Sequence, residues 1–135
     1  MNYRALPLIS VTVTASLLVL SSSAIAAIDC ANAMTQADMS QCAASELDRE
    51  DKKLNAAYSA YRKKLSPEQQ QQFKNVQLAW IKFRDLACTF ESSSSSGGSV
   101  HGMAMGSCLK AKTMQRTADI EAMSKCEEGD VTCVR

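Results

Sequence analysis

The hydrophobic positions between residues 35 and 65 repeat at helical intervals. Apolar or small residues recur at steps of three, four or seven, at Met39, Ala43, Leu47, Leu54, Tyr58, Tyr61 and Leu65. These steps place the residues on one face of an α-helix. Thr35 precedes the run as a candidate cap, with Asp38 three residues later. Although Glu50 and Asp51 interrupt the apolar face, the spacing predicts a first helix over 35–65.

A second helix is predicted to begin at Ser66-Pro67. Serine is a preferred capping residue, and proline is tolerated in the first helical turn. Apolar residues then follow at steps of three and four, at Phe73, Val76, Trp80, Phe83 and Ala87. Because the connection is short, the first two helices are expected to form an antiparallel hairpin.

The periodicity is lost between residues 91 and 106. Five consecutive serines, Ser92–Ser96, precede Gly97-Gly98-Ser99, a composition typical of a flexible polar loop. A third helix is predicted from Ser107 to Lys125, because one side of it carries Leu109, Thr113, Arg116, Ile120 and Met123. No segment alternates as a strand would. The pattern predicts an all-α fold of three antiparallel helices, with a Ser/Gly-rich loop between the second and third.

The N-terminus has the features of a secretory signal peptide. Arg4 gives a positive start, residues 5–20 are apolar and uncharged, and Ala24-Ile25-Ala26 fits a signal peptidase site. A membrane anchor is the alternative, but the apolar run is shorter than the roughly 20 residues that a spanning helix needs. We predict cleavage after Ala26. The remaining single domain, 27–135, would be periplasmic or secreted and would not be attached to a membrane.

Six cysteines follow the predicted signal: Cys30, Cys42, Cys88, Cys108, Cys126 and Cys133. An even number in a small exported chain indicates disulfide bonds. A metal site is the alternative, but the chain has no closely spaced cysteine pair and only one histidine. We therefore expect no metal or cofactor at the cysteines, and fifteen disulfide pairings remain open.

The charge is nearly balanced, with 15 Lys+Arg against 14 Asp+Glu. Only Arg4 leaves with the predicted signal, so the mature chain would be neutral. This balance gives no electrostatic reason to expect binding to nucleic acid.

Three blocks of this sequence resemble the LprI-type lysozyme-inhibitor family. The first, "CANAMTQADMSQCAASELDREDKKLNAAY", carries Thr35, Gln36, Cys42, Ala43, Asp51, Leu54, Asn55 and Tyr58 in the family's order. The second, "QLAWIKFRDLAC", carries Trp80, Arg84, Asp85 and Cys88, and the third carries "GGS", Cys108, Thr113 and Arg116. The resemblance covers about 30–120 and implies a helical periplasmic or envelope domain that binds and inhibits lysozymes. The long serine run and the tail, 126–135, depart from the family pattern.

Nearest neighbours are the pairs we expect among the cysteines. Cys30 and Cys42 flank the start of the first helix, and Cys88 and Cys108 flank the Ser/Gly loop. The last pair, Cys126–Cys133, would close the tail as a short extension.

The loop 91–107 is the candidate partner-binding site. An inhibitor of a glycosidase has to enter a cleft lined by two carboxylates and hold there by hydrogen bonds. The candidate contact residues are Ser95, Ser96, Gly97, Gly98, Ser99 and His101. Serine runs are also common as solvated spacers, which is the alternative for this loop.

His101, Met103 and Met105 alternate along the same segment and suggest a second kind of site. Imidazole and thioether ligands suit Cu(I), so a small copper-binding protein is one alternative function. Methionines more often pack against neighbouring helices.

The remaining family residues are expected to be structural. Tyr58, Trp80 and Phe83 fall on apolar faces and are predicted to be core residues. Adjacent helix residues do not face each other, so Arg84 is expected to pair with Glu46, Glu50 or Asp51, and Asp85 with Arg116.

An enzyme is disfavoured, because the single histidine lies in the loop with no orienting carboxylate. The sequence favours a secreted protein-binding module that occludes the cleft of a lysozyme-type muramidase. A non-inhibitory envelope module with a structural or stress role is the other alternative. A neutral chain gains little attraction to a basic enzyme, although local acidity could come from Glu46, Asp48, Glu50 and Asp51.

Overall fold

The computed structural model describes residues 28–127 and 129–134 and contains three α-helices. They are α1 (Gln36–Arg62), α2 (Pro67–Glu91) and α3 (His101–Met123), with a short 3-10 turn, η1 (Ser93–Ser95), between α2 and α3. No strand occurs in the described part of the chain. The all-α prediction is confirmed, whereas the predicted signal peptide lies outside the described residues.

The two predicted helix starts are confirmed by their capping contacts. The Thr35 hydroxyl accepts a hydrogen bond from the backbone N–H of Asp38 at 3.0 Å. Ser66 and Gln69 form a reciprocal capping box at the start of α2, and Pro67 is its first residue. These contacts satisfy N–H groups that the first turn of a helix leaves without partners.

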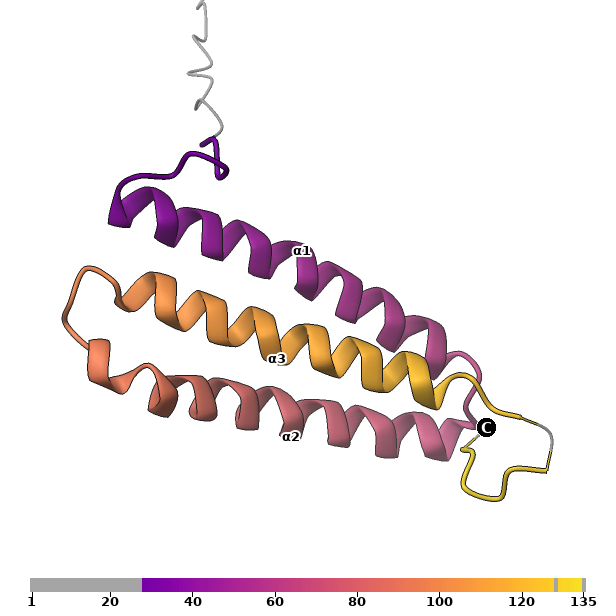
Figure 1. Ribbon diagram of the computed structural model, residues 1–135. Helices are drawn as coiled ribbons and strands as arrows, with labels where there is room; N and C mark the ends of the chain where they lie inside the picture. The colour runs from indigo at the N-terminus through magenta and orange to yellow at the C-terminus, as the bar shows by residue number, and fades with distance from the viewer. Residues whose placement is uncertain (1–27, 128, 135) are drawn as a thin grey trace, which may run out of the picture.

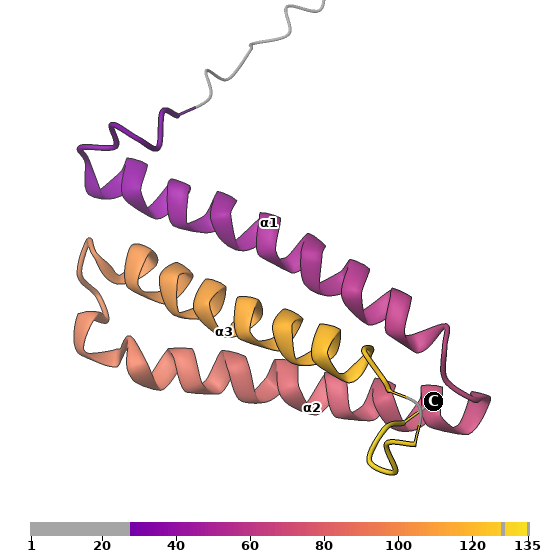
Figure 2. The same ribbon diagram turned by 45° about the vertical axis from the view of Figure 1, so that its right-hand side comes forward.

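The helix α3 lies between α1 and α2 in both ribbon views (Figures 1 and 2). Consecutive helices run antiparallel, so α1 and α3 point the same way. The most extensive packing is between α1 and α3. By contrast, α1 and α2 meet near their short connection, where Tyr58 and Tyr61 contact the ring of Phe73. Over most of their length, α1 and α2 therefore do not pack directly against each other, because α3 lies between them.

The apolar core is concentrated at the end where α1 connects to α2. Its buried members are Leu54, Tyr61, Leu65, Phe73 and Ile120, with Ala57, Tyr58 and Trp80 packed against them. At the opposite end the helices are close because their contact residues are small. Extra Cβ atoms at Gly102 and Gly106 would lie 3.1 Å from the Ser40 hydroxyl oxygen and 3.0 Å from the Ala43 Cβ.

The nearest-neighbour disulfide prediction is confirmed. The bonds are Cys30–Cys42, Cys88–Cys108 and Cys126–Cys133. The first ties the segment before α1 to that helix, the second joins α2 to α3, and the third closes the tail.

The predicted start of α3 at Ser107 is wrong, because the helix already begins at His101. The segment His101–Gly106 has no charged residue and two glycines, so it resembles a loop in sequence. Its glycines instead allow α3 to approach Ser40 and Ala43 of α1.

The predicted apolar face of α2 is only partly correct. Phe73 is buried and Trp80 half-buried, but Val76 and Phe83 are exposed. Polar Gln77 takes one of the buried positions instead. The prediction that Phe83 belongs to the core is therefore wrong.

Candidate functional site

The loop between α2 and α3 forms one end of the molecule, and the Cys88–Cys108 bond closes its base (Figure 1). Ser92 is buried there, and its hydroxyl donates to the carbonyl of Cys88 at 2.7 Å. The turn η1 follows directly. The loop is thus a compact, hydrogen-bonded turn that is shorter than the flexible segment predicted from the sequence.

The predicted contact residues divide into two groups. Ser96, Gly97, Gly98 and Ser99 are exposed, whereas Ser95 and His101 are half-buried.

The half-buried pair is bonded internally. The Ser95 hydroxyl donates to the carbonyl of Ser92 at 2.8 Å and lies 3.2 Å from Nδ1 of His101. The hydroxyl of Ser95 thus has partners both in the preceding turn and in the His101 ring. Gly97 has a φ of +76°, a conformation that other residues rarely adopt. Ser95 and His101 thus shape the loop, and the residues from Ser96 to Ser99 form its exposed tip.

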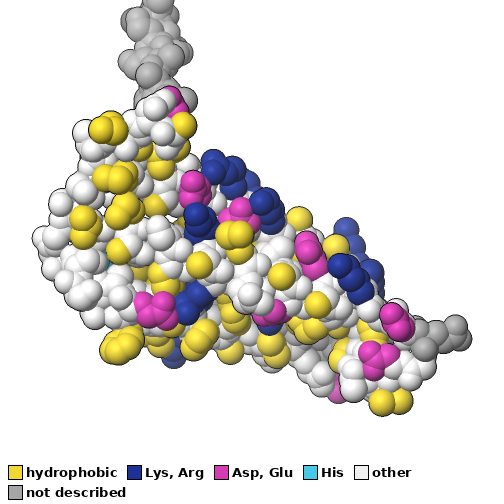
Figure 3. Space-filling view, in the orientation of Figure 1, with side chains coloured by type: hydrophobic (Ala, Val, Ile, Leu, Met, Phe, Trp, Pro, Cys, Tyr) yellow, Lys and Arg dark blue, Asp and Glu magenta, His cyan; other side chains and the backbone are white. Residues whose placement is uncertain are grey.

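An exposed apolar stripe on α2 leads toward this loop. Its members recur at steps of three and four and are Val76, Ala79, Phe83, Leu86 and Phe90. Phe83 is 59% exposed and Phe90 is 79% exposed. Hydrophobic side chains are visible along the lower edge of the molecule, where α2 lies (Figure 3). We refer to these five residues as the α2 stripe.

The α2 stripe was not predicted as a separate surface, although its spacing is visible in the sequence. Several apolar residues of α2 were assigned to a single buried face, and only the position of α3 shows which face is covered. Large exposed apolar patches on small proteins are often binding surfaces.

Arg84 connects side chains from all three helices. Its guanidinium donates to the Asp51 carboxylate at 2.9 Å and to the Thr113 hydroxyl at 3.0 Å. Of the three expected partners, Glu46, Glu50 and Asp51, the structure shows Asp51. A further bond to Asp85, at 3.0 Å, contradicts the expectation that these neighbours do not interact. The long Arg84 side chain reaches back to the adjacent carboxylate.

The prediction that Asp85 pairs with Arg116 is wrong. The Nε of Arg116 donates to the side-chain oxygen of Gln77 at 3.1 Å. The guanidinium carbons of Arg84 and Arg116 both lie within 6 Å of the Trp80 ring, at 5.5 and 5.8 Å. Desolvation by burial lowers the pKa of Arg116. These contacts hold α2 against α3 and give the family residues a structural role.

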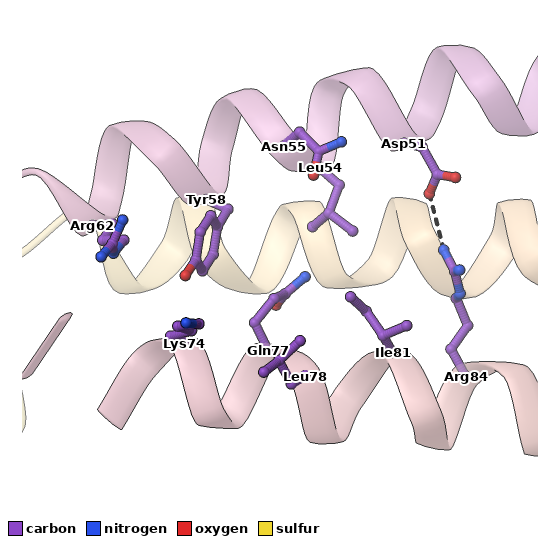
Figure 4. Close-up of a pocket in the computed structure, with 10 residues that line it drawn as sticks. All are labelled: Asp51, Leu54, Asn55, Tyr58, Arg62, Lys74, Gln77, Leu78, Ile81 and Arg84. Atoms are coloured by element: carbon purple, nitrogen blue, oxygen red, sulfur yellow. Dashed lines mark hydrogen bonds and ion pairs between the residues drawn. The ribbon is translucent and has the colours of Figure 1, made fainter. Parts of the chain in front are cut away.

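A groove lies between α1 and α2, with a cavity volume of about 470 Å³ (Figure 4). Leu54 and Tyr58 line it from α1, and Leu78 and Ile81 line it from α2. Its full lining also includes Asp51, Asn55, Arg62, Lys74, Gln77 and Arg84. Several family residues that are distant in sequence therefore meet at one surface.

The residues of the alternative copper site, His101, Met103 and Met105, lie at the start of α3. His101 and Met103 are two positions apart in a helix, which separates their directions by roughly 200°. The Met105 sulfur lies 3.6 Å from the Ser92 hydroxyl. His101 and Met105, four positions apart, lie on the same face of the helix, and Met103 lies on another. Among the described residues, no group of three or more His, Cys, Asp or Glu is arranged to hold a metal.

Comparisons with known proteins agree with the resemblance noted in the sequence. A family model described as "Lysozyme inhibitor LprI" matches residues 28–120. An uncharacterized protein of Rhizobium meliloti (strain 1021) is 30% identical over 113 residues, which cover 74% of this chain and 81% of the relative. No solved structure matches. Within residues 28–127 and 129–134, no helix is both long and apolar enough to cross a membrane.

Proposed function

The chain belongs to the LprI family of lysozyme inhibitors, and from this we propose that it is an exported, non-enzymatic protein that binds a lysozyme-type muramidase and occludes its active cleft. The family match and the three disulfides support a role outside the cytoplasm, because such bonds persist in oxidising compartments.

The preorganised loop is the observation that carries this proposal. The exposed tip Ser96–Ser99 sits on a base closed by the Cys88–Cys108 bond and on the internal Ser95–His101 contact. The exposed serine hydroxyls and the N–H of Gly97 are donors that suit the two carboxylates of a glycosidase cleft, whereas the N–H of Gly98 already donates to the carbonyl of Ser95. A loop that is already ordered loses little conformational entropy on binding.

The α2 stripe supplies contact area that the loop lacks. A stable interface buries about 800 Å² on each partner, more than a tip of four small residues provides. Phe90 is close in sequence to the loop, and Leu86 and Phe83 extend the apolar surface along α2. An apolar centre with a polar margin is the usual composition of a protein interface.

Electrostatic attraction is expected to contribute little. The local acidity considered in the sequence analysis is offset by basic partners: Glu46 pairs with Lys110, Asp48 with Lys52, Glu50 with Lys53 and Asp51 with Arg84. Inhibition should therefore change little between low and physiological salt, unlike that of an acidic inhibitor.

The proposal is tested by measuring the inhibition of several classes of lysozyme by the purified mature protein. Ser96→Glu/Ser99→Glu would place carboxylates against those of the cleft, so inhibition should weaken at least tenfold, a change of about 1.4 kcal/mol. Ser45→Glu/Ser59→Glu on α1 introduces the same charge and should leave inhibition unchanged. An absence of inhibition at micromolar protein would instead favour the non-inhibitory envelope module.

The contribution of the α2 stripe has its own test. Phe83→Ser/Phe90→Ser should weaken inhibition by about tenfold or more, because buried aromatic residues dominate interface energies. Leu78→Ser removes an exposed apolar residue from the opposite flank of α2 and serves as the control. Equal inhibition by the unaltered protein and both variants would exclude the α2 stripe from the interface but would not contradict the proposed role of the loop.

A further inference from the structure

The groove between α1 and α2 has cationic residues at one end that lack partners. Arg62 of α1 and Lys74 of α2 line this end from opposite sides (Figure 4). Neither side chain forms an ion pair or hydrogen bond with any residue that the structure describes. At the other end, Arg84 is already bonded to Asp51. The groove is therefore polarised, with free positive charge at one end only.

The walls between these ends combine apolar surface with unused amide groups. Leu78 and Ile81 are 56% and 36% exposed along the α2 wall. Asn55 on the opposite wall makes no side-chain hydrogen bond within the described chain, and the amide nitrogen of Gln77 also has no partner there. Only the oxygen of Gln77 is bonded, to Arg116.

From this arrangement we propose that the groove binds a short extended peptide through its C-terminal carboxylate. Arg62 and Lys74 would hold the carboxylate, since charge-assisted hydrogen bonds to such a group are strong. Asn55 and Gln77 would bond the peptide backbone from the two walls. Leu78, Ile81 and Tyr58 would contact its apolar side chains.

The length of the groove suits this ligand. Asp51 and Arg62 lie eleven residues apart in α1, which corresponds to about 16 Å along a helix. An extended chain advances about 3.3 Å per residue, so four or five residues fill the distance.

A fatty acid would share the anionic head and the apolar body, but its chain fits the amides poorly. Covering Asn55 and Gln77 with an acyl chain would leave polar groups without hydrogen bonds. A peptide backbone supplies both donors and acceptors at these positions. The groove chemistry therefore favours the peptide.

Calorimetric titration of the mature protein can decide between these ligands. The probes are an N-acetylated tetrapeptide of alternating alanine and leucine with a free carboxylate, the same peptide amidated at its C-terminus, and decanoate. The free-carboxylate peptide should bind, and amidation should weaken it about tenfold or more. Absence of binding at millimolar peptide, or equal binding of both peptides, would overturn the proposal.

Variants locate the binding site. Arg62→Ala/Lys74→Ala should weaken the free-carboxylate peptide at least tenfold, whereas Lys52→Ala/Lys82→Ala removes the same charge from exposed positions outside the groove and should have no effect. Asn55→Leu should weaken the peptide and favour decanoate. If decanoate bound the unaltered protein more tightly than the peptide did, the groove would be a site for acyl chains instead.

Discussion

Arg84 is the side chain through which α1, α2 and α3 are connected. It is only 13% exposed and donates to Asp51 and to the hydroxyl of Thr113. A half-buried guanidinium depends on such partners, because leaving one of its bonds unmade costs the desolvation energy without compensation. The family residues Asp51, Arg84 and Thr113 are thus accounted for by a single structural contact.

Asp51→Ala should lower the free energy of unfolding by about 1–3 kcal/mol, because it removes the carboxylate that Arg84 reaches across to α1 and leaves only the more exposed Asp85 as its ionic partner. Urea denaturation at neutral pH measures this change. Asp48→Ala, one turn earlier in α1, removes an exposed carboxylate whose pair with Lys52 should contribute less than about 1 kcal/mol. Equal losses in the two variants would show that the contact among the three helices has no special weight.

Tyr61 offers a second test at the scale of a single residue. Its phenol is buried and donates to the carbonyl of Val134 at 3.0 Å, and burial raises the pKa of Tyr61 above its ordinary value. The folded state therefore favours the protonated phenol. Its contribution to stability is complete below the pKa of the unfolded tyrosine and is lost as pH rises through the folded pKa.

The unfolding free energy should consequently fall as pH rises above about 10. Tyr61→Phe should lack this component of the fall while losing about 1 kcal/mol at neutral pH through the missing hydrogen bond. Urea unfolding between pH 8 and 11 compares the two proteins. Parallel pH dependence in both would rule out Tyr61 as the responsible group.

The packing of α1 against α3 depends on small residues at its far end. Gly102 and Gly106 face Ser40 and Ala43, and a Cβ at Gly106 would approach that of Ala43 to 3.0 Å. The same glycines weaken the apolar pattern of the first turns of α3. This explains why the sequence suggested a loop where α3 lies close to α1.

Gly106→Val should destabilise the protein by about 1–3 kcal/mol, because the larger side chain forces α3 away from α1. Ala111→Val introduces the same residue at an exposed position of α3 and should cost only its helix propensity, less than about 1 kcal/mol. Thermal unfolding distinguishes the two. If Gly106→Val lowered thermal stability less than Ala111→Val did, close packing between Gly106 and Ala43 would be contradicted.

Across the whole molecule, the disulfides join cysteines that are not members of the buried apolar core cluster. Cys88–Cys108 joins α2 to α3 beneath the loop, whereas Cys126–Cys133 closes the tail. The tail is also anchored where Tyr61 contacts Val134. The core itself is limited to the end where α1 connects to α2.

Cys88→Ala/Cys108→Ala should lower stability by about 3 kcal/mol, as expected for a bond that spans 20 residues. Removing Cys126–Cys133, which spans 7 residues, should cost about 2 kcal/mol. If the loop is the inhibitory element, only the first change should also weaken inhibition, measured at a temperature where both variants remain folded. Unchanged inhibition by the first variant would argue against loop preorganisation.

The sequence by itself determined the helical class and the capping residues Thr35 and Ser66, and it favoured the nearest-neighbour disulfides that the structure contains. These features depend on local spacing and chemistry, which a single chain displays directly. The order of the family residues also predicted the family, which the comparison with known proteins confirmed.

Only the tertiary structure decided which side of each helix is covered. Val76 and Phe83 fit an apolar face as well as Trp80 does, but the position of α3 leaves the first two exposed. The structure also shows that His101 belongs to α3 and that a groove lies between α1 and α2. Periodicity specifies a helix and its faces, whereas the choice of the buried face depends on the helix that packs against it.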